Sequence, residues 1–389
     1  MVRTTVTDPA STAIDTTRPT PAVGESVDRL AKFRPQPKRK KLIIAGITAV
    51  AVGIVGTAVV IEVNRLGSFK RATSSVTSMI KPSIPAAPPP TAPSPLTGLP
   101  VDPGAAKQPI VGIMIENLDP DARPQSGLSD AGVVYDALAE GGITRFLALF
   151  QEPVPSSIGP IRSLRPYYLD WGLEFDAPVI HAGGSQPALA AIGPRGLKNV
   201  EALVLGSPYF TRTSDRLAPH NLYTSTNGVS TVLAKLKFDR QPTFNVWPRK
   251  ADSAEATPSH PTIDIDFGSA SYNVKYTFDS TSNSYARELA GKPHVDRNSG
   301  QQIMVKNVVV EFVPTSYSTQ EDGKPETNIA LIGSGQALVF EDGGKTDATW
   351  KKTSDTSQTQ LIDGNGQPIQ FNRGNSWIEV VPSGNIVTD

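Results

Sequence analysis

Residues 122–185 carry the stretch around which the rest of the chain is organised. It begins ARPQSGLSDAGVVYDALAEGGITRFLALF and ends IGPIRSLRPYYLDWGLEFDAPVIHAGGS. Four arginines, several carboxylates, one histidine and two Gly-Gly steps stand here among residues that are apolar enough to build a core. A group of polar side chains in an apolar frame is typical of a ligand-binding site. The sequence therefore places the candidate site in this stretch.

The composition excludes several kinds of site. The 389 residues include 37 basic and 37 acidic side chains, so no overall positive field points to nucleic acid as a partner. Cysteine is absent, which excludes disulfides, thiolate metal ligands, a cysteine nucleophile and lipid attachment through an N-terminal cysteine.

The first part of the chain predicts a membrane anchor. Residues 1–41 lack periodicity and end in a basic run, which is typical of a disordered cytoplasmic tail. The uncharged run LIIAGITAVAVGIVGTAVVI (42–61) has the length of a bilayer-spanning helix, so residues 42–63 are predicted to form a single-pass transmembrane helix. A cleaved signal peptide is the alternative. The positive charges before this run place the N-terminus in the cytoplasm and the rest outside, where residues 64–95 form a proline-rich stalk.

The outer part is predicted to have an α+β fold in two parts, with a boundary near Ala251. In residues 96–250, PIVGIMIEN (109–117) and ITRFLALF (143–150) favour strands, and PVIH (178–181) leads through a glycine-rich turn to the helical PALAAI (187–192). In residues 251–389, TIDIDF, NVVVEF and SWIEVV alternate apolar and polar residues between turn residues. We therefore expect a mixed α/β part followed by a mainly antiparallel β part.

Several separate stretches carry a resemblance to a known family. ARPQSGLSDAGVVYDALAEGGITRFLALF, IGPIRSLRPYYLDW, VIHAGGS, PHNLYTS and SWIEVVP occur in this order and resemble the DUF3048 family of YerB-like envelope lipoproteins over about residues 95 to 385. The resemblance implies a membrane-tethered, extracytoplasmic bacterial envelope protein, and it carries no catalytic assignments. This chain departs from the lipoprotein pattern because it has no cysteine, so the transmembrane helix would anchor it instead.

The arginines are the first candidates for ligand binding, because the planar guanidinium group suits carboxylates and phosphates. Arg162 and Arg165 stand three residues apart beside a Gly-Pro step and could converge on one anion. The alternative is that the arginines pair internally with Asp136, Glu140, Asp170 or Asp176. The predicted ligand-binding residues are Arg123, Arg145, Arg162, Arg165, His181, Ser185, His220 and Asn221. They predict a recognition or regulatory module for an anionic cell-wall component, such as a wall glycan or polymer, or for a wall-synthesis protein.

The rival prediction is a hydrolase or transferase that acts on peptidoglycan or an attached polymer. Its acid and base groups would be Glu140, Asp215 and His220, or a carboxyl pair drawn from Asp136, Glu140 and Glu174. Two further arrangements use the histidines: a nucleophilic triad of Ser185, His220 and Asp215, and a metal site with His181 and His220. No HExxH or similar spacing supports a metal, so neither a metal nor a cofactor is predicted. A scaffold for protein partners is the third possibility.

Overall fold

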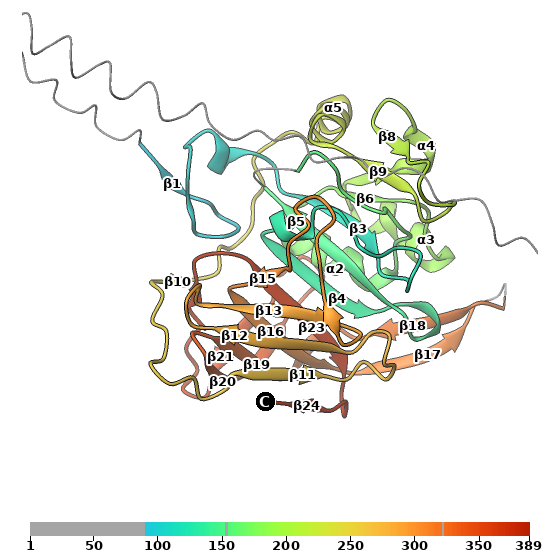
Figure 1. The fold of residues 1–389 in the computed structure, drawn as a ribbon. Helices are drawn as coiled ribbons and strands as arrows, with labels where there is room; N and C mark the ends of the chain where they lie inside the picture. The colour runs from blue at the N-terminus through green and yellow to red at the C-terminus, as the bar shows by residue number, and fades with distance from the viewer. Residues whose placement is uncertain (1–89, 152–154, 321–322) are drawn as a thin grey trace, which may run out of the picture. The chain divides into compact units, whose positions relative to one another are not determined.

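The computed structural model describes residues 90–151, 155–320 and 323–389 (Figure 1). All of these lie in one compact unit, Ala86–Asp389. The predicted tail, the predicted transmembrane helix and most of the predicted stalk lie outside the described residues. Within the described ranges, the helices are too short or too polar to span a bilayer.

A ten-stranded mixed sheet forms the centre of this unit. Its strands, in spatial order, are β21 (Gln360–Asp363), β20 (Gly344–Lys352), β19 (Gly333–Glu341), β16 (Asn307–Val313), β23 (Ser376–Pro382), β4 (Val133–Leu138), β5 (Thr144–Phe150), β3 (Val111–Glu116), β6 (Val179–His181) and β7 (Asn199–Glu201). Strand β23 lies parallel to both of its neighbours, β16 and β4. Strands β3, β4 and β5 are buried along their whole length, as expected for apolar runs covered on both faces.

A six-stranded antiparallel sheet covers one face of the large sheet. It consists of β14 (Lys292–Pro293), β13 (Ser284–Leu289), β12 (Val274–Asp279), β11 (Thr262–Ile265) and β24 (Val387–Thr388), with β15 (Met304–Val305) paired to β13. Burial alternates along β12 and β13, because one side packs inward and the other faces solvent. Tyr276 and Tyr285 share a core with Val308 and Val310 of the large sheet.

Helices cover both faces at the other end of the large sheet (Figure 1). Helices α2 (Pro166–Glu174) and α3 (Gln186–Arg195) pack on one face, where Tyr168 and Trp171 join a core with Tyr135 and Leu147. Helix α5 (Thr226–Leu236) packs on the opposite face through Val229 and Val232. Helix α2 begins with a proline, which is favoured in a first turn because no N–H is needed there.

The remaining elements are short. They are α4 (Ala202–Leu205), the 3₁₀ turns η1 (Ala105–Lys107), η2 (Leu128–Asp130) and η3 (Glu140–Gly142), and the strand pairs β1–β2 (Ala92–Pro93, Pro100–Val101), β8–β9 (Phe210–Arg212, Leu222–Thr224), β10–β22 (Arg249–Lys250, Phe371–Asn372) and β17–β18 (Thr315–Thr319, Pro325–Ile329). Strands therefore dominate the regular structure.

The predicted α+β composition is confirmed in its coarse form, with more strand and less helix than a mixed α/β part implies. The strand expected at 143–150 is present as β5, and the sequence of strand, glycine-rich turn and helix at 178–192 is present as β6 and α3. The two predicted parts share the ten-stranded sheet, because β23 lies between β16 and β4.

Candidate anion-binding site

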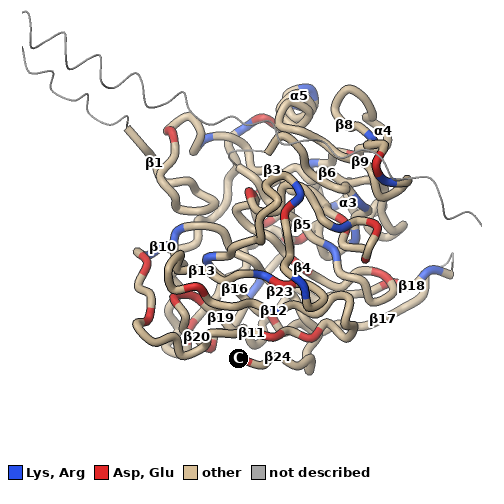
Figure 2. The backbone as a smooth tube through the Cα atoms, in the orientation of Figure 1, with Lys and Arg blue, Asp and Glu red and all other residues tan. Residues whose placement is uncertain are grey.

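Glu140 holds two arginines at the end of the sheet. Its Oε1 lies 2.6 Å from Nη2 of Arg145, and its Oε2 lies 2.5 Å from Nη2 of Arg165. Arg145 is fully buried on β5 and also donates to the Ser163 carbonyl. Two guanidinium groups thus share one carboxylate, which leaves one positive charge in excess. Acidic and basic residues are otherwise interspersed over the described chain (Figure 2). The excess positive charge beside Glu140 therefore makes this cluster a candidate anion site.

The pKa shifts report the same imbalance. Burial alone raises the pKa of Glu140, but attraction and hydrogen bonding to Arg145, together with attraction to Arg165, outweigh burial and lower the pKa to about 2. Burial and then repulsion by Arg145 lower the pKa of the Arg165 guanidinium. The Nε atom of Arg165 is buried without a hydrogen-bond partner among the described residues. The cluster therefore favours an additional negative charge.

A pocket of about 690 Å³ opens beside this cluster, and we call it the α3 pocket. Its lining residues are Ser163, Arg165, Gly184, Ser185, Gln186, Leu189, Ala190, Gln320 and Lys324. The first seven come from the loop before α2 and from the start of α3, and the last two from the segment of β17 and β18. Residues of both predicted parts, 96–250 and 251–389, thus line the α3 pocket.

The start of α3 presents backbone donors to the α3 pocket. Ser185 is the N-cap, and its Oγ accepts from the Ala188 N–H at 3.4 Å. The N–H groups of Gly184 and Gln186 donate to no acceptor within the described part of the chain. Free N–H groups at a helix N-terminus bind anions, because the helix dipole adds partial positive charge there. A Cβ at Gly184 would lie 2.9 Å from Cδ2 of Leu189 and 3.2 Å from the Leu164 carbonyl oxygen, so glycine eases the close approach of chain and helix.

Arg162 lies next to this cluster in sequence but contacts a different carboxylate. Glu116, whose side chain is 1% exposed, forms an ion pair with Arg162, whose Nε lies 3.0 Å from Oε1, and its Oε2 lies 2.9 Å from Nδ1 of His220. Arg162 and Arg165 therefore do not share a protein carboxylate, and the Arg162 guanidinium is only partly exposed.

The other predicted site residues lie apart from the α3 pocket. His181 bonds to Asn199 and to the Gly183 carbonyl, and it stands 3.3 Å from Glu201. Asn221 accepts from Arg212 and bonds to two carbonyl groups of its own loop. Arg123 lines a separate pocket. Of the eight predicted residues, only Arg165 and Ser185 line the α3 pocket. Arg145 does not line it, but it contacts Glu140, which also holds Arg165.

The residues of the rival, catalytic predictions also lie in separate places. Asp136 contacts Arg287 at 2.7 Å, whereas Glu174 contacts Lys352 at 2.9 Å. Asp215 pairs with Arg297 at 2.8 Å, whereas His220 contacts Glu116 at 2.9 Å. In the described ranges, no group of three or more His, Cys, Asp or Glu residues is placed to hold a metal ion. The aromatic residues Tyr167, Tyr168 and Trp171 of α2 are buried in the core, so they offer no exposed ring for a sugar.

The sequence analysis did not predict several polar residues that have defined contacts in the structure. Arg287, Glu379 and His294 form a buried network, and Gln320 and Lys324 complete the α3 pocket. One signal was available for the network: Arg287 and Glu379 interrupt the apolar strands SYAREL and SWIEVV. Lys324 carried no such signal, because an isolated lysine in a polar segment is ordinary.

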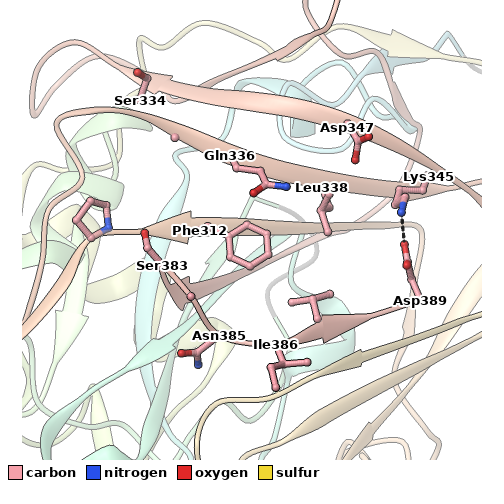
Figure 3. A pocket seen from close by; sticks show the side chains of 14 residues that line it. Phe312, Ser334, Gln336, Leu338, Lys345, Asp347, Ser383, Asn385, Ile386 and Asp389 are labelled. Carbon is pink, nitrogen blue, oxygen red and sulfur yellow. Dashed lines mark ion pairs between the residues drawn. The ribbon is translucent and has the colours of Figure 1, made fainter.

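A further pocket of about 580 Å³ lies against the large sheet beside β24 (Figure 3). Its one basic side chain, Lys345, is paired with Asp389 at 2.7 Å. Because Asp347 also lines it, this pocket has an excess of negative charge, unlike the α3 pocket.

Comparisons with known proteins agree with this architecture. Residues 96–239 match the family described as the N-terminal domain of a protein of unknown function, DUF3048, and residues 263–378 match the DUF3048 C-terminal domain. The chain is 31% identical over 292 residues to YerB of Bacillus subtilis (strain 168), a protein whose name classes it provisionally as a lipoprotein. That match covers 74% of this chain and 86% of the relative.

A solved structure shows the same similarity. The crystal structure of the YerB protein from Bacillus subtilis superimposes with a TM-score of 0.67 at 28% sequence identity, and the match covers 77% of this chain and 99% of that one. The chain belongs to the DUF3048 family.

Proposed function

We propose that this chain is an extracytoplasmic envelope protein, tethered to the membrane through residues 42–63, that recognises an anionic, phosphate-bearing cell-wall component in the α3 pocket. One observation carries the proposal: the unbonded N–H groups of Gly184 and Gln186 and the guanidinium of Arg165 line the same pocket. The relative YerB is named as a lipoprotein, which supports a place at the membrane.

The described geometry favours recognition over hydrolysis. A carboxyl pair for glycoside hydrolysis needs two carboxyls about 5 to 9.5 Å apart across a cleft. At the α3 pocket Glu140 is the carboxylate that holds the arginines, and its pKa of about 2 keeps it ionised at neutral pH. It therefore positions Arg145 and Arg165 and does not serve as a proton donor. A wall-synthesis protein that presents a phosphate or carboxylate would use the same donors.

The decisive experiment removes one backbone donor. Gln186 is the first residue of α3, where proline is well tolerated, and Ser185 before it has φ −66° and ψ 152°, a conformation that is compatible with a following proline. Gln186→Pro deletes the N–H, whereas Gln186→Ala keeps it. Binding of a glycerol-phosphate polymer to the full-length chain in detergent micelles is measured by calorimetry.

We expect Gln186→Ala to bind as the unmodified chain does and Gln186→Pro to bind about tenfold more weakly, because a charge-assisted hydrogen bond is lost. Equal affinities of the two variants, or no binding by the unmodified chain, would contradict the proposal. Circular dichroism of both variants checks that α3 is retained.

A further inference from the structure

We propose a second binding site, independent of the α3 pocket, that takes a carboxylate group attached to a small apolar body, such as the C-terminal end of a short peptide. It is a pocket of about 550 Å³, here called the Arg123 pocket. Three segments form it: the loop after β3, the turn before β12 and the β13–β14 turn. It lies where the two family-matched regions meet, and it shares no lining residue with the α3 pocket.

Arg123 is fixed on one side and open on the other. Its Nε donates to Asn117 Oδ1 at 2.9 Å, and its Nη2 donates to the carbonyls of Asn117 and Ser271 at 3.1 and 2.8 Å. The guanidinium also lies over the Tyr272 ring at 5.2 Å. Nη1 makes no hydrogen bond to any described residue, and its one ionic neighbour is Asp119 Oδ1 at 3.7 Å. A rigid guanidinium thus keeps two N–H donors for a ligand.

Lys292 supplies a second cation to the Arg123 pocket. It is exposed on β14 and lines the pocket, and it has no carboxylate within salt-bridge distance in the described ranges. Asp119 is the one acidic lining residue, so Arg123 and Lys292 leave one positive charge in excess. The Asp119 carboxylate opposes a dianion such as phosphate more strongly than it opposes a carboxylate, which carries a single charge.

The rest of the Arg123 pocket lining is neutral and mostly apolar. His294 Nδ1 lies 2.6 Å from Nη1 of Arg287, which can only donate, so Nδ1 accepts and Nε2 carries the hydrogen that bonds Gln125 at 3.1 Å. Burial and repulsion by Arg287 lower the pKa of His294, which agrees with a neutral ring. Pro120, Leu289 and Pro293 are among the apolar residues that line the pocket. These walls suit small aliphatic groups next to the carboxylate.

The test compares two ligands that differ only in the carboxylate. N-acetyl-alanyl-alanine and its C-terminal amide are titrated into the full-length chain in detergent micelles and followed by calorimetry. We expect the acid to bind and the amide to bind at least about tenfold more weakly, because the amide loses the charge-assisted contact with Arg123.

Lys292→Gln provides the matched variant, since an exposed side chain can be changed without disturbing the core. We expect it to weaken binding of the acid about threefold and to leave the amide unchanged. The control is Lys351→Gln, which removes an exposed lysine from β20, outside this pocket. Arg123→Lys keeps the charge but removes the planar guanidinium, so it should reduce the difference between acid and amide. Its thermal midpoint is measured to show that it folds.

The proposal is overturned if acid and amide bind equally, if the acid does not bind at millimolar concentration, or if Lys292→Gln and Lys351→Gln have the same effect. Retention of acid binding in Gln186→Pro shows that this site is separate from the α3 pocket.

Discussion

Asp136 and Glu379 are paired residues on the neighbouring parallel strands β4 and β23, and both are fully buried. Arg287, from the six-stranded sheet, contacts them at 2.7 and 3.3 Å. One guanidinium thus faces two carboxyl groups, and one oxygen of each, Asp136 Oδ1 and Glu379 Oε2, is buried without a partner among the described residues. A proton held by Asp136 would satisfy both oxygens. Burial, and then the charge of Glu379, raises the pKa of Asp136.

This pair makes stability depend on pH. The folded chain keeps a proton that the unfolded chain releases above its ordinary pKa, so the free energy of unfolding falls as pH rises from about 4. We expect Asp136→Asn to reduce this slope and to be at least as stable as the unmodified chain at neutral pH, because an amide cannot ionise. Urea unfolding at several pH values measures this. Asp239→Asn, an exposed control, should keep the slope, and an unchanged slope in Asp136→Asn would exclude a proton on Asp136.

Glu311 is a second buried acid, on the opposite face of the sheet. Burial and then the charge of Glu174 raise its pKa to about 8. Stability that is present below the unfolded pKa is therefore lost as pH rises toward 8. We expect Glu311→Gln to raise the free energy of unfolding by roughly a few kcal/mol at pH 8. Near pH 4 the substitution should change this free energy little. Equal effects at both pH values would contradict a protonated Glu311.

At the scale of single elements, two helical glycines lie in opposite surroundings. A Cβ on Gly228 of α5 would lie 2.4 Å from the Tyr209 carbonyl oxygen and 2.8 Å from Thr224 Oγ1, whereas a Cβ on Gly193 of α3 would meet nothing within 4 Å. Helix α5 can thus approach the β8–β9 segment closely only through glycine.

We expect Gly228→Ala to lower the free energy of unfolding by about 1–3 kcal/mol, because α5 must move away from its neighbours. Gly193→Ala should change it by less than about 1 kcal/mol, because the space is open, but the strain of a side chain before Pro194 opposes the higher helix propensity of alanine. Thermal and urea unfolding of both variants measure the two changes. If Gly228→Ala loses no more stability than Gly193→Ala, the packing of α5 is not as described.

Element boundaries were largely predictable where periodicity was strong. The apolar run at 109–117 and the β-branched and aromatic residues at 143–150 indicated strands, and β3 and β5 are there. The glycine-rich turn before PALAAI indicated an anion-binding helix start, and α3 begins there with Ser185 as its cap. Local residue preferences suffice for such elements, because each is stabilised by its own pattern of burial.

At the scale of the molecule, strand β23 joins the two family-matched regions. It comes from near the end of the chain and lies between β16 and β4 in parallel register with both. Ile378 of β23 is buried in the core that also contains Tyr135 and Val309. The two regions therefore share their central strand, and we expect them to unfold together.

Ile378→Ala tests this coupling. The substitution should lower the free energy of unfolding by about 2–5 kcal/mol. Native-state hydrogen exchange should then show the same loss of amide protection in β5 as in β19. These strands belong to different family-matched regions, and neither is a neighbour of β23. A loss confined to β19 would show that the regions unfold independently.

The candidate site was predictable in its residue types but not in its partners. The arginines and the glycine-rich turn were predicted to form one site, but Arg145 and Arg165 share Glu140, whereas Arg162 pairs with Glu116. Which carboxylate an arginine meets depends on strand register and loop path, because side chains far apart in sequence are brought together only by the fold.

The sequence by itself determined the strands, the start of α3 and membership of the DUF3048 family, because these depend on local patterns and on several motifs in order. Its predicted transmembrane helix lies outside the described residues and stays a prediction. Only the tertiary structure decided that Arg287 meets Asp136 across 151 positions and that Lys324 reaches the α3 pocket. The physical reason is that pairing between distant strands follows from the packing of both sheets together, and no local periodicity records it.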